Sequence, residues 1–310
     1  MTATWDSFVA RFRIPVVAAP MTAVSGLELA DAATRAGIGG SFPVHNADSP
    51  AEVADWLRRS DENPGPVIPN LVVHRSNARL SDDLSVLTTH QVPAVITSVG
   101  SPHAVVGPLH DSGVLVLSDV GSLRHAERAV AAGADGLVLL TAGAGGQTGW
   151  ANPLAFAHAV RQIWGGPMVL AGGIADGRSV LAALVAGFDL VYMGTPFIAT
   201  TESAAPQGWK EAVVRASIDD IELTSAFTGL PTSMIRAPRE TSWETPAGQF
   251  DLSRLDSTGL SDADSGARYS AGHSATGVQE VLTVAALVDK VEREFLDAKA
   301  ELAQQLSVGS

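Results

Sequence analysis

The sequence of 310 residues contains no cysteine, and this absence excludes disulfide bonds, thiolate metal ligands and a thiol nucleophile. Positive charge is scarce, because 20 Lys and Arg residues stand against 33 Asp and Glu residues, a formal net charge of −13. An acidic chain without a basic stripe repels nucleic acids and anionic membrane surfaces. We therefore expect a small molecule as the partner, and neither nucleic acid nor membrane.

Long hydrophobic runs are also missing. The longest apolar stretches, such as 137–140 and 168–171, have the length of strands and fall far below the ~20 residues that span a bilayer. Residues 1–20 lack the apolar core of a signal peptide, so a cytoplasmic location is expected. With 46% hydrophobic and 17% charged residues, the chain can bury the core of one large domain or two smaller ones.

Short apolar segments alternate with helix-start signals along the first two thirds of the chain. The predicted strands cover residues 14–20, 39–43, 66–73, 94–99, 114–118, 136–141, 168–171 and 189–193. Helix starts follow them, including the capping-box patterns of 25–28 and 49–52 and Asn152 before Pro153. Strands without alternation are covered on both faces, as in a closed parallel barrel. We predict an α/β fold, a (β/α)8 TIM barrel, with an open doubly wound sheet as the alternative.

This rhythm breaks between residues 200 and 277, where proline and small polar residues interrupt any long apolar period. Helical spacing returns at 278–305. We therefore predict that residues 1–199 and 278–310 form the barrel. Residues 200–277 would be an inserted irregular or helical cap after the eighth strand, which holds the residues that select the substrate.

Glycine-rich turns follow the seventh and eighth predicted strands. Gly172 and Gly173 come after one, and Gly194 and Thr195 after the other. Glycine allows backbone amides to approach a phosphate, and the threonine adds a hydroxyl donor. These two loops are the habitual phosphate site of a TIM barrel. The alternative is that the glycines only form tight turns.

A second glycine-rich run, 141–150, follows the sixth strand and includes Gly145 and Gly146. It contains no lysine and does not follow the P-loop pattern. Such a run allows close approach to a flat ligand and places the long polar side chain of Gln147 at the barrel mouth, although a hairpin without a ligand is the alternative. The ends of the first and third strands place three more residues there: Pro20, Met21 and Asn70.

Taken together, the segments 18–21, 144–149, 171–178 and 193–203 resemble the nitronate monooxygenase (2-nitropropane dioxygenase-like) family, over nearly the whole chain. The resemblance implies a TIM barrel that binds FMN. It implies phosphate contacts from Gly172, Gly173, Gly194 and Thr195, and ring or ribityl contacts from Pro20, Met21, Asn70, Gly145 and Gly146.

Two residues depart from the family pattern. Gln147 stands where nitronate-oxidising members carry a histidine base, and Asp119 where several relatives carry lysine. Glutamine cannot accept a proton at neutral pH, but it can polarise a carbonyl. The glycine-rich form also resembles a subgroup that acts on acyl-CoA thioesters in steroid-ring catabolism. We therefore expect redox chemistry on an unsaturated or hydroxylated acyl or cyclic substrate, with His273 or His45 as the proton partner.

Other functions remain open. A nitronate is already an anion and needs no base, so nitronate oxidation with O2 is one alternative. A non-redox barrel that binds a phosphorylated metabolite and a flavin-binding protein without turnover are two more. The sequence also leaves open whether NAD(P)H supplies electrons and whether the chain forms a homodimer. No metal is predicted, because the histidines are scattered and no acidic cluster stands at a strand end.

Overall fold

The computed structural model describes residues 4–60, 62–90, 92–226, 229–236 and 268–308. Within these residues, eight parallel strands form one sheet in the order β2-β1-β9-β8-β6-β5-β4-β3. The strands are β1 (Val16–Ala18), β2 (Gly39–Gly40), β3 (Asn70–Val72), β4 (Ala94–Ser98), β5 (Leu115–Val120), β6 (Gly136–Leu140), β8 (Met168–Ala171) and β9 (Leu190–Met193).

The first and last strands in this order, β2 and β3, are also joined to each other. Parallel bridges pair Gly40 with Val67 and Pro43 with Asn70. The Asn70 N–H donates to the Phe42 carbonyl at 2.8 Å. The sheet therefore closes into a barrel, which confirms the predicted (β/α)8 fold and removes the open sheet as an alternative.

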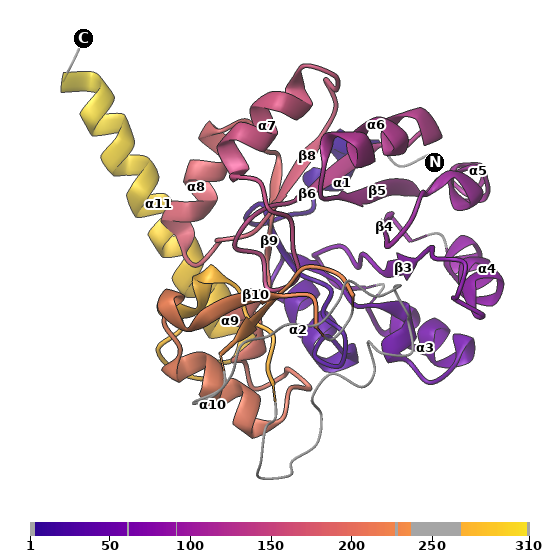
Figure 1. Ribbon diagram of the computed structural model, residues 1–310, viewed down its shortest axis with the longest axis horizontal. Helices are drawn as coiled ribbons and strands as arrows, with labels where there is room; N and C mark the ends of the chain where they lie inside the picture. The colour runs from indigo at the N-terminus through magenta and orange to yellow at the C-terminus, as the bar shows by residue number, and fades with distance from the viewer. Residues whose placement is uncertain (1–3, 61, 91, 227–228, 237–267, 309–310) are drawn as a thin grey trace.

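A ring of helices surrounds the strands (Figure 1). They are α2 (Leu27–Arg35), α3 (Pro50–Ser60), α4 (Leu80–His90), α5 (His103–Asp111), α6 (Leu123–Ala132), α7 (Pro153–Arg161) and α8 (Gly177–Val185). Local capping explains several starts: Ser122 accepts from the N–H of His125, and Asn152 accepts from Leu154 and Ala155. The start of α7 at Pro153 thus agrees with the helix-start signal of Asn152 in the sequence.

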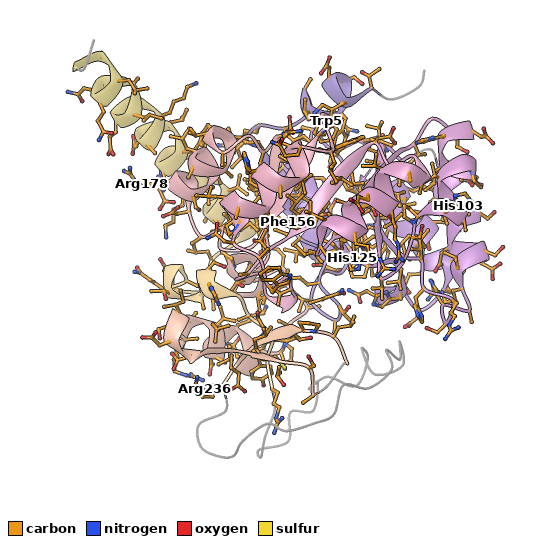
Figure 2. All side chains as sticks on the ribbon, turned by 45° about the horizontal axis from the view of Figure 1, so that its top comes forward. Trp5, His103, His125, Phe156, Arg178 and Arg236 are labelled. Carbon is orange, nitrogen blue, oxygen red and sulfur yellow. The ribbon has the colours of Figure 1, made fainter. Side chains whose placement is uncertain are left out.

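The barrel interior is filled by apolar side chains that come from nearly every strand. They include Val17, Ile68, Ile96, Leu117, Val138, Val169 and Leu190. A short helix that the sequence analysis missed, α1 (Trp5–Val9), inserts Phe8 into this cluster. Trp5 and Arg236 lie at opposite ends of the molecule, so α1 closes the end away from the inserted segment (Figure 2). The other end of the barrel is left for a ligand.

The inserted segment contains regular structure that the sequence did not reveal. Its elements include α10 (Gln207–Arg215), β10 (Ile221–Thr224) and β11 (Thr232–Ile235), and the short helix α9 (Thr195–Ile198) precedes it. β11 pairs antiparallel with β10 and with β7 (Gly146–Gln147), which belongs to the glycine-rich run after β6. Residues 227–228 and 237–267 of the predicted cap lie outside the described residues. The division into barrel and cap stays a prediction.

The closing helix α11 (Val284–Val308) begins six residues later than predicted, because Leu282 forms a parallel bridge with Thr200 just before it. The Glu202 carboxylate accepts from the Val284 N–H at 3.0 Å, and this contact marks the helix start. α11 packs along α8, and its last turns extend beyond the barrel (Figure 1). Among the described residues, no helix combines the length and apolar character needed to cross a membrane.

Candidate active site

One cavity at the carboxyl ends of the strands collects most of the predicted site residues. Its lining includes Pro20, Met21, Asn70, Gly145, Gly146, Gln147, Gly172, Gly173, Gly194 and Thr195. Most of them lie after the carboxyl ends of β1, β6, β8 and β9, whereas Asn70 is the first residue of β3. The strand-end rule therefore places distant parts of the sequence at one site.

Gly172 and Gly173 form an open backbone corner after β8. Both have positive φ angles, 134° and 73°. A Cβ on Gly172 would lie 2.5 Å from Thr141 Oγ1, whereas one on Gly173 would meet nothing within 4 Å, so the backbone there faces open space. Across the corner, the buried Thr195 hydroxyl accepts from the Gly272 N–H at 2.8 Å. Its own hydrogen remains to donate, and such a corner suits a phosphate.

The turn after β1 is fixed by polar contacts that the sequence analysis did not find. Asn46 Nδ2 donates to the carbonyls of Met21 and Ser25, both at 3.0 Å. The Met21 N–H donates to Ser25 Oγ at 3.1 Å. Ser25 therefore holds this turn and does not cap α2, whose N-cap is Gly26, so the predicted capping box is wrong. The result is a rigid Pro20–Met21 edge of the cavity.

Asn70 and the end of β4 form the adjacent wall. The Asn70 side chain is buried, and its Oδ1 accepts from Ser98 Oγ at 3.1 Å. The amide oxygen is thus engaged, and the amide nitrogen is oriented to donate to a ligand. Val99 next to it has a φ of 58°, which is strained for a β-branched residue. Neither Ser98 nor Val99 carried a signal in the sequence.

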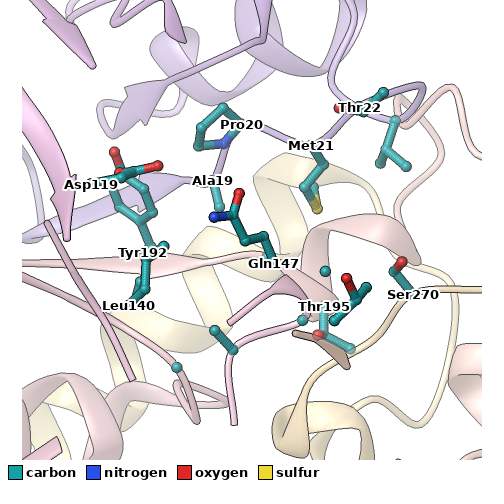
Figure 3. Close-up of a pocket in the computed structure, with 18 of the residues that line it drawn as sticks. Ala19, Pro20, Met21, Thr22, Asp119, Leu140, Gln147, Tyr192, Thr195 and Ser270 are labelled. Atoms are coloured by element: carbon teal, nitrogen blue, oxygen red, sulfur yellow. The ribbon is translucent and has the colours of Figure 1, made fainter. Parts of the chain in front are cut away.

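Gln147 lies at the mouth on β7, where the inserted hairpin holds its backbone. It pairs with Thr232 of β11, and the neighbouring Thr148 N–H donates to the Pro231 carbonyl at 3.0 Å. Its side chain is exposed and lies between Pro20 and Thr195 in the close-up (Figure 3). The amide can therefore reach a ligand in the cavity.

Two further polar groups enter the cavity from the barrel interior, Asp119 of β5 and Tyr192 of β9. Asp119 Oδ1 and the Tyr192 hydroxyl are buried and have no hydrogen-bond partner among the described residues. Burial raises the pKa of Asp119 to about 7. Burial, together with the nearby Asp119, holds the pKa of Tyr192 well above its usual value. Asp119 thus faces the predicted ligand site. Tyr192 lines the same site, although the sequence analysis did not predict it as a site residue.

The two candidate histidines lie in different surroundings. His45 lines the cavity, and its Nε2 lies 3.2 Å from Thr22 Oγ1. The backbone N–H of His273 donates to Gly143, but its side chain is exposed and does not line the cavity, whereas that of Ser274 does. The geometry brings His45, and not His273, to the other site residues.

The inserted segment supplies an apolar wall. Trp209, Leu230 and Met234 line the cavity on this side. Trp209 is fixed because its Nε1 donates to the Ser270 carbonyl at 2.9 Å and its ring stacks on Tyr269, with centroids 5.4 Å apart. These residues were missed because the segment has no readable apolar period. Among the described lining residues there is no lysine or arginine, and the titratable ones are His45, Asp119 and Tyr192.

Solved structures share this architecture. FabK from Thermotoga maritima superimposes with a TM-score of 0.79 and 24% identity, covering 96% of this chain and 97% of that one. Nitroalkane oxidase from Streptomyces ansochromogenes gives a TM-score of 0.81 and 24% identity, covering 95% and 99%. At this level of identity the likeness shows the fold alone.

Sequence relatives carry two different names. A nitronate monooxygenase of Paraburkholderia phytofirmans is 27% identical, with 94% of each chain covered. An indene-carboxyl-CoA dehydrogenase of Mycobacterium tuberculosis is 27% identical over 72% of this chain. This chain spans 54% and 63% of the lengths of the first two mycobacterial relatives that it matches.

The model of one protein family matches residues 42–293, which is most of the chain and includes β3 to β11 and the start of α11. The named relatives are oxidoreductases. The matched region contains the glycine turns at Gly172–Gly173 and at Gly194, and it contains Gln147. The chain belongs to the nitronate monooxygenase family.

Proposed function

We propose that this protein is an FMN-dependent oxidoreductase that acts on a neutral unsaturated or hydroxylated acyl or cyclic substrate. The observation that carries the proposal is one cavity whose lining combines three features. They are a backbone corner at Gly172 and Gly173 that suits a phosphate, the uncharged amide of Gln147 and an apolar wall. The proposal keeps the cofactor and substrate class expected from the sequence. It takes His45 as the proton partner in place of His273.

The cavity fits FMN on two structural grounds. The corner of Gly172, Gly173 and Thr195 offers backbone and hydroxyl groups to a phosphate, which needs no cation when several donors converge. At the other side of the cavity, Asp119 Oδ1 and the Tyr192 hydroxyl are buried polar atoms without a partner in the described residues. The polar atoms of a heteroaromatic ring could supply their missing hydrogen bonds. When bound, FMN supplies hydride or single-electron transfer, while the protein orients the substrate and controls the proton.

The electrostatics of the lining favour a neutral reacting group. A nitronate anion would meet no lysine or arginine among the described lining residues, and it would share the cavity with Asp119. Gln147 is uncharged and can donate a hydrogen bond to a carbonyl oxygen, which stabilises charge that develops there. Trp209, Leu230 and Met234 suit an apolar acyl or ring body. The name of the mycobacterial dehydrogenase supports this choice.

His45 is the residue proposed to move the substrate proton. It lies in the cavity beside Thr22, and an imidazole changes its charge near neutral pH. Replacing His45 with glutamine should lower the rate of substrate reduction or oxidation while leaving FMN affinity unchanged. His273→Gln serves as the matched control, because its exposed side chain lies outside the lining. Equal losses in the two variants would contradict the assignment.

The substrate class can be tested on one preparation. The FMN-loaded protein is reduced with NADPH under argon, and the return of flavin absorbance is followed after addition of an α,β-unsaturated acyl thioester, which accepts electrons. In a separate sample the oxidised protein receives an alkyl nitronate, which donates electrons and would bleach the flavin. The proposal expects the reoxidation by the thioester to be faster than the bleaching by the nitronate. Reoxidation of the flavin by O2 but not by the thioester would contradict it.

Nitronate oxidation is the second candidate, and the family match and the Paraburkholderia relative favour it. A nitronate needs no base, so Gln147 does not exclude this reaction. Oxidised, FMN-loaded protein that is bleached by a nitronate and turns over with O2, without response to thioesters, would establish it in place of the leading proposal.

A further inference from the structure

Two buried polar atoms in the cavity have no partner in the described part of the chain, Asp119 Oδ1 and the Tyr192 hydroxyl. Their strands, β5 and β9, are not neighbours in the sheet, so the two side chains meet across the barrel. In the close-up they lie together at one side of the cavity, while Thr195 and Ser270 lie at the other (Figure 3). The unpartnered pair is thus separated from the phosphate-type corner.

Buried polar groups in native proteins nearly always have hydrogen-bond partners, so an unpartnered pair at a cavity wall indicates a ligand. The ligand has to be elongated to contact both the corner at Thr195 and this pair. It also has to present polar atoms at that end, because a carboxyl and a phenol hydroxyl both form directional hydrogen bonds. A flavin meets both requirements, since its phosphate and its ring carbonyls lie at different ends.

We propose that Asp119 is a proton-carrying ligand of the flavin ring, which binds as a neutral carboxylic acid and donates its O–H to a ring acceptor beside Tyr192. This inference rests on the proposed function, because it takes the flavin as the ligand. Asp119 can hold a proton near neutral pH because one of its carboxyl oxygens, Oδ1, is buried and no lysine or arginine lines the described cavity.

Proton-linked flavin binding follows from this contact. A ligand that accepts a hydrogen bond from the neutral acid favours the protonated form, so binding takes up a proton where the free carboxyl is ionised. Flavin affinity should therefore fall by about tenfold per pH unit above about pH 7. The other titratable groups that line the described cavity are Tyr192 from β9 and His45 from the turn after β2.

The test measures flavin binding and not turnover. Dissociation constants of riboflavin and FMN are determined by fluorescence quenching from about pH 6 to about pH 8.5, and proton uptake is measured by calorimetry in buffers of different ionisation enthalpy. Riboflavin is included because it lacks the phosphate, whose own ionisation would otherwise imitate the effect. Wild-type protein should take up about one proton at the upper end of the range.

The variant Asp119→Asn should bind both flavins with an affinity that does not change with pH and with no proton uptake. Tyr192→Phe and His45→Gln keep the carboxyl and should retain the pH dependence. Equal affinity of wild-type protein for riboflavin across the range would overturn the inference, as would loss of the dependence in His45→Gln. Failure of every form to bind either flavin would instead overturn the proposed function itself.

Discussion

At the scale of single residues, Asp119 is the least expected part of the site. A carboxyl at the end of a barrel strand, with one oxygen buried and unpartnered, destabilises the fold when it is ionised. Burial raises the pKa of this carboxyl to about 7. Such a residue is understandable where a ligand completes its hydrogen bonds, which makes the stability of the flavin-free protein informative.

The stability of the flavin-free protein should depend on pH through Asp119. The folded chain keeps a proton that the unfolded chain releases above about pH 4, so the free energy of unfolding falls as pH rises from about 4 to about 7. Asp119→Asn removes this loss. At pH 8 it should be more stable than wild type by up to about 4 kcal/mol, and below pH 4 the difference should vanish.

Urea titrations of both proteins at several pH values give this difference. Asp297→Asn is the control, because Asp297 is exposed on α11. A constant difference between Asp119→Asn and wild type at all pH values would show that the carboxyl does not titrate as described.

Gln147 offers a second test at the residue scale. Replacement by histidine supplies a base at a position that reaches the cavity, so turnover of a neutral nitroalkane should rise by about 10²-fold or more. Turnover of the corresponding nitronate, which needs no deprotonation, should change little. Gln147→Asn is the control for altered shape without a base. An unchanged nitroalkane rate in Gln147→His would show that the missing base is not what limits the reaction.

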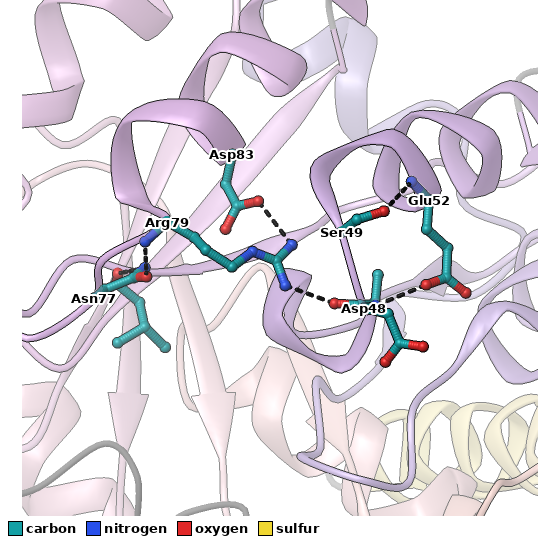
Figure 4. Close-up of polar contacts among 8 residues, drawn as sticks. Asp48, Ser49, Glu52, Asn77, Arg79 and Asp83 are labelled. Atoms are coloured by element: carbon teal, nitrogen blue, oxygen red, sulfur yellow. Dashed lines mark hydrogen bonds and ion pairs between the residues drawn. The ribbon is translucent and has the colours of Figure 1, made fainter.

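At the scale of elements, a partly buried ion pair beside α4 also contacts the backbone before α3. Arg79, just before α4, donates to Asp83 Oδ1 at 3.0 Å and to the Ala47 carbonyl before α3 at 2.7 Å (Figure 4). The Asp83 side chain is fully buried, and its Oδ2 has no partner in the described residues. The pair therefore positions α3 and α4 against each other.

Removing one member of this pair should lower the free energy of unfolding more than removing both members does. Arg79→Met leaves Asp83 buried without a cation, and the free energy of unfolding should fall by about 3–5 kcal/mol. The double variant Arg79→Met/Asp83→Leu should recover most of that loss. Arg58→Met, which breaks an exposed pair with Asp55, should cost less than about 1 kcal/mol. Denaturant unfolding distinguishes these cases, and additive losses in the double variant would refute the coupling.

The start of α11 depends on a carboxylate from the inserted segment. Glu202 accepts from the Val284 N–H with both oxygens, at 3.1 and 3.0 Å. Glu202→Ala should lower the free energy of unfolding by about 1 kcal/mol, as loss of a helix cap does, and Glu202→Gln should lower it less because an acceptor remains. Thermal unfolding of the three proteins measures the effect. Identical losses in the two variants would contradict the capping role.

The features that the sequence predicted correctly are those that depend on contacts between residues close together in the chain. Asn152 caps its helix as expected, because an N-cap needs only its own side chain and the next turn. Ser25 fits the same pattern, yet the structure uses its hydroxyl to hold the turn after β1. The pairing of Gln147 with Thr232 was not predictable, because the two residues lie far apart in the sequence and Thr232 belongs to the irregular inserted segment.

At the scale of the whole molecule, the barrel was predictable because eight apolar strands without alternation require cover on both faces. The same rule brought the strand-end residues of the site together, including Met21 and Thr195. It could not rank His45 above His273, because which one reaches the cavity depends on the inserted segment. Tyr192 was missed for a similar reason: within a buried strand, a ligand-facing tyrosine looks like any core residue.

The most direct test of the central claim is the absorbance spectrum of the purified protein before and after addition of FMN and then NADPH under argon. The account predicts a bound oxidised flavin spectrum that shifts relative to free FMN and bleaches with the nicotinamide. A colourless protein that leaves the spectrum of added FMN unchanged would contradict the cofactor assignment, and the cavity would then have to serve a different phosphorylated ligand.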